Sequence, residues 1–558
     1  MTTTISQVTL LASAVEAMQC RSAFSAFAGR APSGATGDEA DAAFALLLDA
    51  TLDLPGHVGE PTRQIDEVSP WTGRALGVSY PRAQAEDLIE HAHRAQAGWD
   101  RADADLRATV CVSGIERLFA ENEVLGLAAM HTTGQGRGMS QSGSGTNALD
   151  RGLEAVAGSW QALQRVPSGA VWEQTFGTEK VSLEKTYRAM PLGVALVVAC
   201  ASFPAWNVYP AVFANLMAGN PVIVKPHPTS VLQMALAVRI LRATLADAGF
   251  SPDLVQLATD TVAEPITSIL ATHRDVRIVD FTGSQRYGAW IEEHARQARV
   301  YTETSGLNSV VLQGLPEPDA DLRAIAGALS LFSAQMCTAP QNIYIPSDGV
   351  AIPGGRMSAD DLEQGIVDAL AAVWSSPRRA AAVLGTIQSA QTIDELGALT
   401  ARVRARGRVL SEPRTWEAPG FPEARTTTPL VVRVDVTDGD LFDHECFGPA
   451  VFLIRVPSAR AGLERAASDA ARHGAITAFV YATDADFIAD AEDAFAAAGA
   501  ALTVNVTGAM PINFSAAFSD FHVSGLNPAG TATLTDDAFV SGRFRVVQSR
   551  RPLRPATV

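Results

Sequence analysis

The stretch GVALVVACASFPAWNVYPAVFANLMAGNPVIVKP, residues 193–226, decides the fold of this chain. Two short apolar runs, GVALVVAC and PVIVKP, read as buried strands, and the segment PAVFANLMAG between them reads as a helix. Further apolar runs follow, separated by helix-like segments: LVQLA at 254–258, VRIVDFTG at 276–283 and RVYTETS at 299–305. This alternation predicts an α/β fold with a parallel sheet covered on both faces, a Rossmann-like architecture. Ligands of such sheets bind at the carboxyl ends of the strands.

A second set of strand-like runs begins after residue 305, again interleaved with helices, and predicts a second α/β domain. Its members are NSVVLQG (308–314), QNIYIP (341–346), LVVRVDV (430–436), AVFLIRV (450–456), TAFVYAT (477–483) and ALTVNVTG (501–508). Before the first set, residues 1 to about 60 are expected to be helical, interrupted by a surface loop at GRAPSGATGDEAD, and helical spacing recurs over 85–130.

Composition limits the class of protein. A chain of 558 residues usually divides into two or three domains. Its net charge of −17 opposes binding to nucleic acid and to anionic membranes, and no apolar run reaches the length of a membrane span. Five cysteines form no CxxC and no metal-ligand spacing, so we expect no metal and a reducing compartment, the cytoplasm.

One cysteine stands out by its neighbours. Cys337 lies in SAQMCTAPQNIYIP (333–346) among small and polar residues, whereas Cys200 lies in an unbroken apolar run. Glu303 closes the last strand of the first set, so it and Cys337 are expected to meet where the two domains join. A thiolate nucleophile with a carboxylate able to activate water suits covalent acyl chemistry, although either residue alone is more often structural.

Other polar residues follow predicted strands and leave two interpretations open. Asn207 could donate a hydrogen bond to a developing oxyanion or cap a helix. Lys225 ends a buried strand and could meet an anion or extend to solvent. Gly283 and Ser284 precede a helix whose backbone N–H groups could hold a pyrophosphate, but strand-to-helix turns often contain glycine anyway.

Taken together, these motifs resemble landmarks of the aldehyde dehydrogenase superfamily over about residues 65–550: AWN, AGNPVIVKP, FTGS, ETSG followed by QMC, and ECFGP. A narrower set is similar to the phenylacetic acid degradation protein PaaN subfamily: FPAWNVYP, VKPHPTS, DFTGS, QMCTAPQNIY, GLNPAGT and the extended N-terminus.

The resemblance implies two Rossmann-like α/β domains plus a small β oligomerisation element. The expected parts are a helical extension at 1–60, a cofactor domain at 61–304 with a β-hairpin near 171–190, a catalytic domain at 305–525, and an oligomerisation strand, RFRVVQSR, with a tail at 526–558. A homodimer or homotetramer is expected, since an unpaired C-terminal strand would expose its edge.

The resemblance also implies a mechanism. Cys337 would attack an aldehyde carbon, and the Asn207 amide with the Cys337 backbone N–H would hold the oxyanion. Hydride transfer would leave a thioester, which water activated by Glu303 would hydrolyse. The expected substrate is a semialdehyde of phenylacetate or aromatic degradation, a CoA-linked one included. A CoA-acylating dehydrogenase is the rival enzyme, which Glu303 argues against, and a catalytically idle binding subunit is the rival of another class.

For the cofactor, the resemblance assigns the adenosine ribose to Lys225 and the pyrophosphate to the turn at Gly283 and Ser284. Trp206 would also line the cofactor site, and Glu445 with Phe447 in ECFGP would fix the nicotinamide ribose. Many NAD-preferring members carry a glutamate three residues after the lysine, where this chain has Pro228. We therefore expect NADP in preference to NAD, with His227 or a nearby cation helping to bind a 2′-phosphate.

The chain also departs from the family pattern. Ser305 replaces a glycine after Glu303, and SDFHVSGLNPAG (519–530) differs from the common glycine-rich segment, which leaves the substrate pocket undefined. His473 and His522 could border a substrate tunnel, but an ordinary surface or packing role is favoured for both. The other four cysteines are expected to pack: Cys20, Cys111, Cys200 and Cys446.

Overall fold

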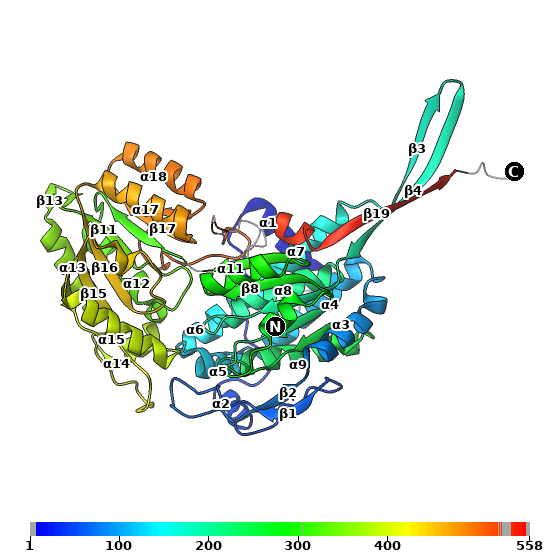
Figure 1. Ribbon diagram of the computed structural model, residues 1–558, viewed down its shortest axis with the longest axis horizontal. Helices are drawn as coiled ribbons and strands as arrows, with labels where there is room; N and C mark the ends of the chain where they lie inside the picture. Colours follow the sequence, from blue (N-terminus) through cyan, green and yellow to red (C-terminus); the bar gives the residue numbers. More distant parts are fainter. Residues whose placement is uncertain (1–6, 305, 523, 525, 527–536, 554–558) are drawn as a thin grey trace.

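The structure is a computed structural model that describes residues 7–304, 306–522, 524, 526 and 537–553. Figure 1 shows two lobes, each built around a β-sheet, and a long β-arm that projects from one of them and carries the C-terminal strand. Within the described residues, no helix is long and apolar enough to cross a membrane.

The first lobe contains the sheet predicted from the run at 193–226. In the described part of the chain it has five parallel strands in the order β7-β6-β5-β8-β9. The strands are β5 (Val194–Val198), β6 (Val222–Lys225), β7 (Val255–Leu257), β8 (Val276–Gly283) and β9 (Arg299–Thr304). The prediction of a parallel, doubly covered sheet is confirmed.

Helices cover both faces of this sheet because successive side chains of each buried strand point to opposite faces. Ala195 and Val197 of β5 pack in one core with α8 and α9, and Val194 and Leu196 pack in another with α3, α10 and α11. The connecting helices are α8 (Pro204–Met217), α9 (Leu232–Asp247), α10 (Thr267–Thr272) and α11 (Gln285–His294), with 3-10 turn η2 (Pro252–Leu254) before β7. Helix α8 begins at Pro204, a residue suited to a first helical turn, and Asn207 therefore lies in that turn.

The second lobe contains a sheet of seven described strands in the order β14-β15-β16-β11-β10-β17-β18. Its strands are β10 (Ser309–Leu312), β11 (Asn342–Pro346), β14 (Arg408–Ser411), β15 (Leu430–Asp435), β16 (Ala450–Val456), β17 (Thr477–Tyr481) and β18 (Ala501–Val504). Six of these were predicted, whereas β14, an antiparallel edge strand, was missed because it lacks an apolar run.

Helices again form a layer on each face of the second sheet. Helices α12 and α13 share one core with it, and α15, α17 and α18 share the other. The helical elements are α12 (Pro318–Ser330), η3 (Leu331–Ala334), α13 (Ala359–Val373), α14 (Pro377–Val383), α15 (Ala390–Arg404), α16 (Gly439–Phe442), α17 (Ala459–His473) and α18 (Ala485–Ala498), and a small hairpin joins β12 (Val350–Ile352) to β13 (Gly355–Met357).

The arm in Figure 1 is a three-stranded antiparallel sheet in the order β19-β4-β3. Its strands are β3 (Gly169–Phe176), β4 (Glu179–Pro191) and β19 (Phe544–Pro552), with α19 (Asp537–Ser541) just before β19. The hairpin expected near 171–190 is β3–β4, and the C-terminal strand pairs with β4 of its own chain from Phe544 opposite Pro191 to Pro552 opposite Leu183.

The N-terminal part differs from the expectation of a helical segment up to residue 60. Helices α1 (Gln7–Cys20) and α2 (Asp38–Ala45) are present, but residues 46–59 contain no helix and β1 (Glu60–Arg63) pairs with β2 (Ser79–Arg82). Helix α1 packs against α7. This contact was not predicted from the sequence. The helices before the arm are α3 (Ala85–Trp99), α4 (Ala104–Ala120), α5 (Asn122–Thr133), α6 (Arg137–Gln141), the π-turn η1 (Ser142–Thr146) and α7 (Asn147–Gln164).

Candidate active site

The three predicted catalytic residues meet between the two lobes. Asn207 comes from the first turn of α8, Glu303 from the carboxyl end of β9, and Cys337 from the loop between η3 and β11. The Asn207 Nδ2 donates to Glu303 Oε1 at 3.3 Å. A fourth residue, His522, joins them: its Nε2 lies 3.0 Å from Glu303 Oε1 and 3.5 Å from Cys337 Sγ.

The loop that presents Cys337 has an unusual backbone. Phe332, Ser333 and Ala334 adopt φ values of 50°, 50° and 55°, the left-handed region that side chains other than glycine rarely occupy. Such strain persists only where the surroundings impose it. Hydrogen bonds hold these residues: Ser333 Oγ donates to the Leu384 carbonyl at 3.1 Å, and Gln335 Nε2 donates to the Phe332 carbonyl at 3.2 Å. Next to them, Asn308 Nδ2 donates to the Cys337 carbonyl at 2.7 Å. The thiol is therefore held at a defined place.

The electrostatic surroundings keep the Cys337 thiol protonated at rest. Burial raises the pKa of this thiol well above its usual range, and the Glu303 carboxylate raises it further. Cys200 lies nearby, and burial raises its pKa to about 11. Burial likewise raises the pKa of Cys111 and of Cys446 to about 12, whereas Cys20 is exposed. A base must therefore take the thiol proton before sulfur can act as a nucleophile.

A surface position for His522, one of the two ordinary roles favoured for it, is wrong. Its side chain is 2 % exposed and lies in the catalytic cluster, because the segment 515–522 returns to the carboxyl ends of the strands. The ligand-type atoms of His522, Glu303 and Cys337 lie within 4.8 Å of one another. Since Nε2 lies within hydrogen-bond distance of both Glu303 Oε1 and Cys337 Sγ, a proton can pass between these groups. His473 ends α17, and its backbone carbonyl accepts a hydrogen bond from Gln285 Nε2.

Lys225 ends β6 and has a partner that the sequence analysis missed. Its Nζ lies 2.5 Å from Asp260 Oδ1 and donates to the Pro226 carbonyl at 2.8 Å. Both side chains are buried, and burial lowers the pKa of Lys225 while Asp260 opposes that shift. The alternative that Lys225 extends to solvent is therefore wrong: it meets a carboxylate at the carboxyl edge of the sheet.

Pro228 and His227 lie in the turn that follows. Pro228 is buried, and its carbonyl accepts a 2.6 Å hydrogen bond from Gln64. Burial, with Lys225 as the second cause, lowers the pKa of His227 to about 4, so its imidazole is neutral at pH 7. Without a ligand, His227 therefore adds no positive charge beside Lys225.

Two helix N-termini face the carboxyl ends of the central strands, and they differ. At the start of α9, the backbone N–H groups of Val231 and Leu232 donate to the buried carboxylate of Glu67, at 2.7 and 2.8 Å. At the start of α11, Ser284 is the N-cap residue, and its Oγ accepts from the Tyr287 N–H. Since a carboxylate already fills the first, the start of α11 is the better place for a ligand's phosphate.

Trp206 lies beside the catalytic cluster. Its ring centroid is 6.2 Å from that of His522, and the Arg151 guanidinium carbon lies 4.9 Å from it on another side. Glu445 is half-buried and near enough to raise the pKa of Cys337, whereas the side chain of Phe447 is 39 % exposed. Trp206 and Glu445 therefore both lie near the catalytic cluster.

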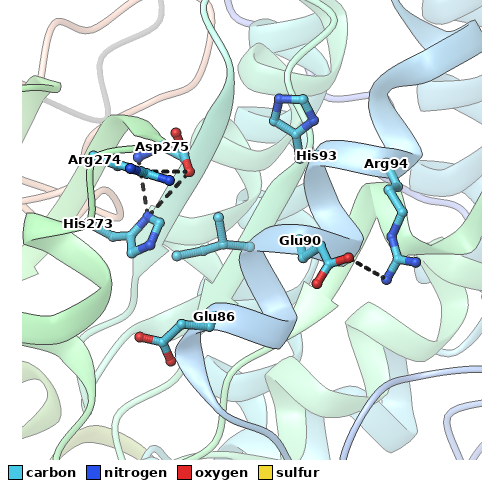
Figure 2. A pocket seen from close by; sticks show the side chains of 8 residues that line it. Glu86, Glu90, His93, Arg94, His273, Arg274 and Asp275 are labelled. Carbon is cyan, nitrogen blue, oxygen red and sulfur yellow. Dashed lines mark hydrogen bonds and ion pairs between the residues drawn. The ribbon is translucent and has the colours of Figure 1, made fainter.

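A surface hollow lies elsewhere, between α3 and the turn before β8 (Figure 2). It is lined by Glu86, Ile89, Glu90, His93, Arg94, His273, Arg274 and Asp275. The charges compensate one another, as in the 3.6 Å pair of Arg94 and Glu90. Because the turn at 273–275 precedes β8, this hollow is at the amino end of the strand, opposite the edge where Cys337 and Glu303 meet.

Asp260 was not identified from the sequence, and His522 was named only as a possible border of a substrate tunnel. Asp260 follows β7 by three residues, and a carboxylate directly after a buried strand is a signal that could have identified it. His522 lies in an irregular segment with no periodic pattern, so no local signal was available. Ser305 and most of the GLNPAGT motif lie outside the described residues.

Comparison with known proteins gives the family. The model of the aldehyde dehydrogenase family matches residues 57–533. A crystal structure of an NAD-dependent aldehyde dehydrogenase from Burkholderia multivorans superposes with a TM-score of 0.91 at 40 % identity, covering 98 % of each chain.

Curated relatives are more distant. A 3,4-dehydroadipyl-CoA semialdehyde dehydrogenase of Aromatoleum evansii is 27 % identical over 56 % of this chain and 61 % of its own. An N-succinylglutamate 5-semialdehyde dehydrogenase of Paraburkholderia xenovorans is 26 % identical over 71 % of this chain and 77 % of its own. The chain spans between about half and three fifths of the length of the first curated relatives it matches. With the matched family model and the shared fold, the chain belongs to the aldehyde dehydrogenase family.

Proposed function

We propose that this chain oxidises an aldehyde to a carboxylic acid with NAD or NADP, through a thiohemiacetal and a thioester on Cys337. The observation that carries the proposal is the meeting of Cys337, Glu303 and Asn207, which come from three separate parts of the chain. Sulfur supplies the nucleophile, the amide a donor for the oxyanion, and the carboxylate a base for water.

The hydrogen bond between Asn207 and Glu303 has a consequence for this reaction. Asn207 Nδ2 donates to Glu303, so in this arrangement it points at a carboxylate. The amide nitrogen carries a second hydrogen, which can hold the oxyanion next to the Cys337 N–H while the first stays on Glu303. Glu303 then takes a proton from the water that attacks the thioester.

The residues fit a dinucleotide at the carboxyl edge of the first sheet. Lys225 uses two of its three donors on Asp260 and Pro226, which leaves one for a ribose hydroxyl. The start of α11 at Gly283 and Ser284 would hold the pyrophosphate, and Glu445 with Phe447 and Trp206 would hold the nicotinamide end. The nicotinamide, when bound, accepts the hydride that the aldehyde carbon loses.

Two features favour NAD, against the preference for NADP drawn from Pro228. Asp260 places a carboxylate beside Lys225, where it would repel a 2′-phosphate. His227 is neutral and adds no cation. We therefore propose NAD as the better cofactor, with NADP as the alternative, and note that the Burkholderia relative is described as NAD-dependent.

For the substrate, we propose a semialdehyde of phenylacetate or other aromatic degradation, in the manner of the phenylacetic acid degradation protein PaaN subfamily. The names of the two curated relatives support a semialdehyde, one of them CoA-linked. Because Glu303 lies within the cluster around the thiol, we propose release of a free acid over CoA acylation or an idle binding role.

The test is reduced-cofactor formation at 340 nm with a panel of semialdehydes, each with NAD and with NADP. Wild-type enzyme should turn over, Cys337→Ala should be inactive, and Cys20→Ala, which changes an exposed thiol, should match wild type. If added CoA were required and the product were a thioester, the acylating alternative would hold. If cofactor bound but no aldehyde reacted, the idle-subunit alternative would hold.

We also propose the division into an extension at 1–60, a cofactor domain at 61–304, a catalytic domain at 305–525 and a C-terminal strand and tail at 526–558. The free thiol of Cys337 suits the reducing cytoplasm.

For the oligomer, we propose that the arm joins subunits into a homodimer or homotetramer. Val171, Phe176, Val546 and Val547 on the arm are between 43 % and 60 % exposed, which suggests a covered face in an assembly. Light scattering of Val547→Asp should show a smaller particle than wild type. An unchanged mass for this variant and for Phe176→Asp would exclude the arm as the interface.

A further inference from the structure

We propose that His522 is a catalytic residue of this centre and the base that takes the proton from the Cys337 thiol. Its Nε2 lies 3.5 Å from Cys337 Sγ and 3.0 Å from Glu303 Oε1, so one ring nitrogen faces both reacting side chains. The other ring nitrogen, Nδ1, lies 3.2 Å from Ser515 Oγ, which can either donate or accept. This inference rests on the proposed role of Cys337 as the nucleophile.

The fold holds His522 in this place from several sides. Phe518, four residues earlier, is fully buried and packs edge-on against Phe24 of the N-terminal extension, with ring centroids 5.0 Å apart. Arg21 lies over the ring of Phe521 at 4.8 Å. Ala516 N–H donates to Asp520 Oδ2 at 2.7 Å and closes the turn. The extension at 1–60 therefore supports the segment that carries the histidine.

The charges around the thiol explain why a second group is needed. The acidic groups Glu303 and Glu445 face Cys337 and disfavour a thiolate, as does the neighbouring Cys200. Behind Trp206, the buried pair of Arg151 and Glu154 adds charges of both signs. An imidazolium formed at His522 is the cation that lies directly against the sulfur among the described residues, and it is matched by the Glu303 carboxylate at 3.0 Å.

Protons and electrons balance over the proposed reaction. With the ring hydrogen on Nδ1 facing Ser515 Oγ, the lone pair of His522 Nε2 binds the thiol proton, the S–H bond of Cys337 breaks, and sulfur keeps the electron pair. The thiolate attacks the aldehyde carbon, and its hydride leaves with the cofactor of the proposed function. Glu303 then takes a proton from water, hydroxide adds to the thioester carbon, the C–S bond breaks, and the leaving sulfur takes back the proton held by His522. Glu303 passes its proton to solvent, which is the one proton released when the carboxylic acid forms.

The test is the pH dependence of alkylation of Cys337 by iodoacetamide in enzyme without cofactor, with EDTA present, followed by mass spectrometry of the peptide that contains Cys337. In wild type we expect alkylation at pH 7, because His522 Nε2 accepts the thiol proton as sulfur attacks the reagent. In His522→Gln the rate at pH 7 should fall by roughly 30-fold or more, and the midpoint should move to the alkaline range. His473→Gln is the matched control and should behave as wild type.

Two further measurements distinguish a base at His522 from a residue that only packs. Added imidazole should restore part of the alkylation rate to His522→Ala, which a packing role would not allow. With a substrate aldehyde, His522→Gln should lower kcat/KM by about 10²-fold, the scale of a lost general base. If the two variants alkylate with the wild-type pH profile, or if wild type itself alkylates only in the alkaline range, the inference is overturned. Because alkylation needs neither aldehyde nor cofactor, this can fail while the proposed dehydrogenase activity stands.

Discussion

Two buried carboxylates on adjacent strands of the first sheet have very different partners. Asp280 of β8 accepts hydrogen bonds from Arg543 at 2.6 and 2.8 Å and from Asn215 at 2.9 Å. Glu303 of β9 is contacted at 3.3 Å by Asn207 and at 3.0 Å by His522. A bidentate guanidinium fixes the first carboxylate, whereas the second has longer single bonds to groups that can exchange or release it. The first therefore suits a structural role and the second a catalytic one.

The surroundings of Arg543 support this contrast. The side chain is fully buried, and its guanidinium carbon lies 4.3 Å from the ring of Tyr301 and 4.1 Å from that of Phe539. It lies between α19 and β19, so the ion pair attaches the C-terminal strand to the cofactor sheet. Burying a charged pair is favourable only when its geometry is complete, as it is here.

The largest expected effect is on catalysis at the less constrained carboxylate. Glu303→Gln should lower kcat by about 10³-fold, within the usual range for a general base, because the amide cannot take a proton from water. Stopped-flow measurement should still show a burst of reduced cofactor, since thioester formation would continue and hydrolysis would limit turnover. Glu293→Gln, at an exposed position on α11, is the control. A loss of the burst together with kcat would place Glu303 before the thioester and weaken the assignment.

The next effect is on stability at the fixed carboxylate. Arg543→Met leaves Asp280 buried without its cation and should lower the free energy of unfolding by about 3–5 kcal/mol. Urea unfolding measures the loss, and Arg545→Met, at an exposed position of β19, should stay close to wild type. A loss below about 1 kcal/mol would mean that water or another group replaces the guanidinium, and the contrast between the two carboxylates would not hold.

The smallest expected effect is on the pH dependence of stability at Asp150 of α7. Among the described residues, no ion pair to this carboxylate is present. Its Oδ1 accepts from the Ala26 N–H at 2.9 Å, and burial raises its pKa from 3.8 to about 6. Because the folded state holds the proton more tightly, its contribution is present below about pH 4 and is lost as the pH rises towards 6. The free energy of unfolding should therefore fall with pH by about 1 kcal/mol per unit in this window.

Asp150→Asn keeps an acceptor for the Ala26 N–H and removes the titration. Urea midpoints of the variant and of wild type at pH 4.5, 5.5 and 6.5 should diverge steadily, with the variant gaining as the pH rises. Parallel curves would show that the carboxyl ionises in the folded state as freely as in the unfolded chain, contrary to its burial.

The sequence alone determined the α/β architecture and the chemical core of the site. Buried parallel strands must be apolar along their whole length, so runs such as 194–198 and 276–283 stand out without any tertiary information. Cys337 was found because its polar surroundings differ from a packing environment, and Glu303 because it closes a strand. Both signals are local.

Only the tertiary structure decided which groups those residues meet. His522 and Asp260 reach their partners through chain segments far apart in sequence, and neither lies in a repeating pattern that records the contact. Likewise, the group that packs against a buried carboxylate decides whether the carboxylate has a structural role or can act as a base. The strand positions of Asp280 and Glu303 look alike in sequence, and it is Arg543 in one case and His522 in the other that separates their roles.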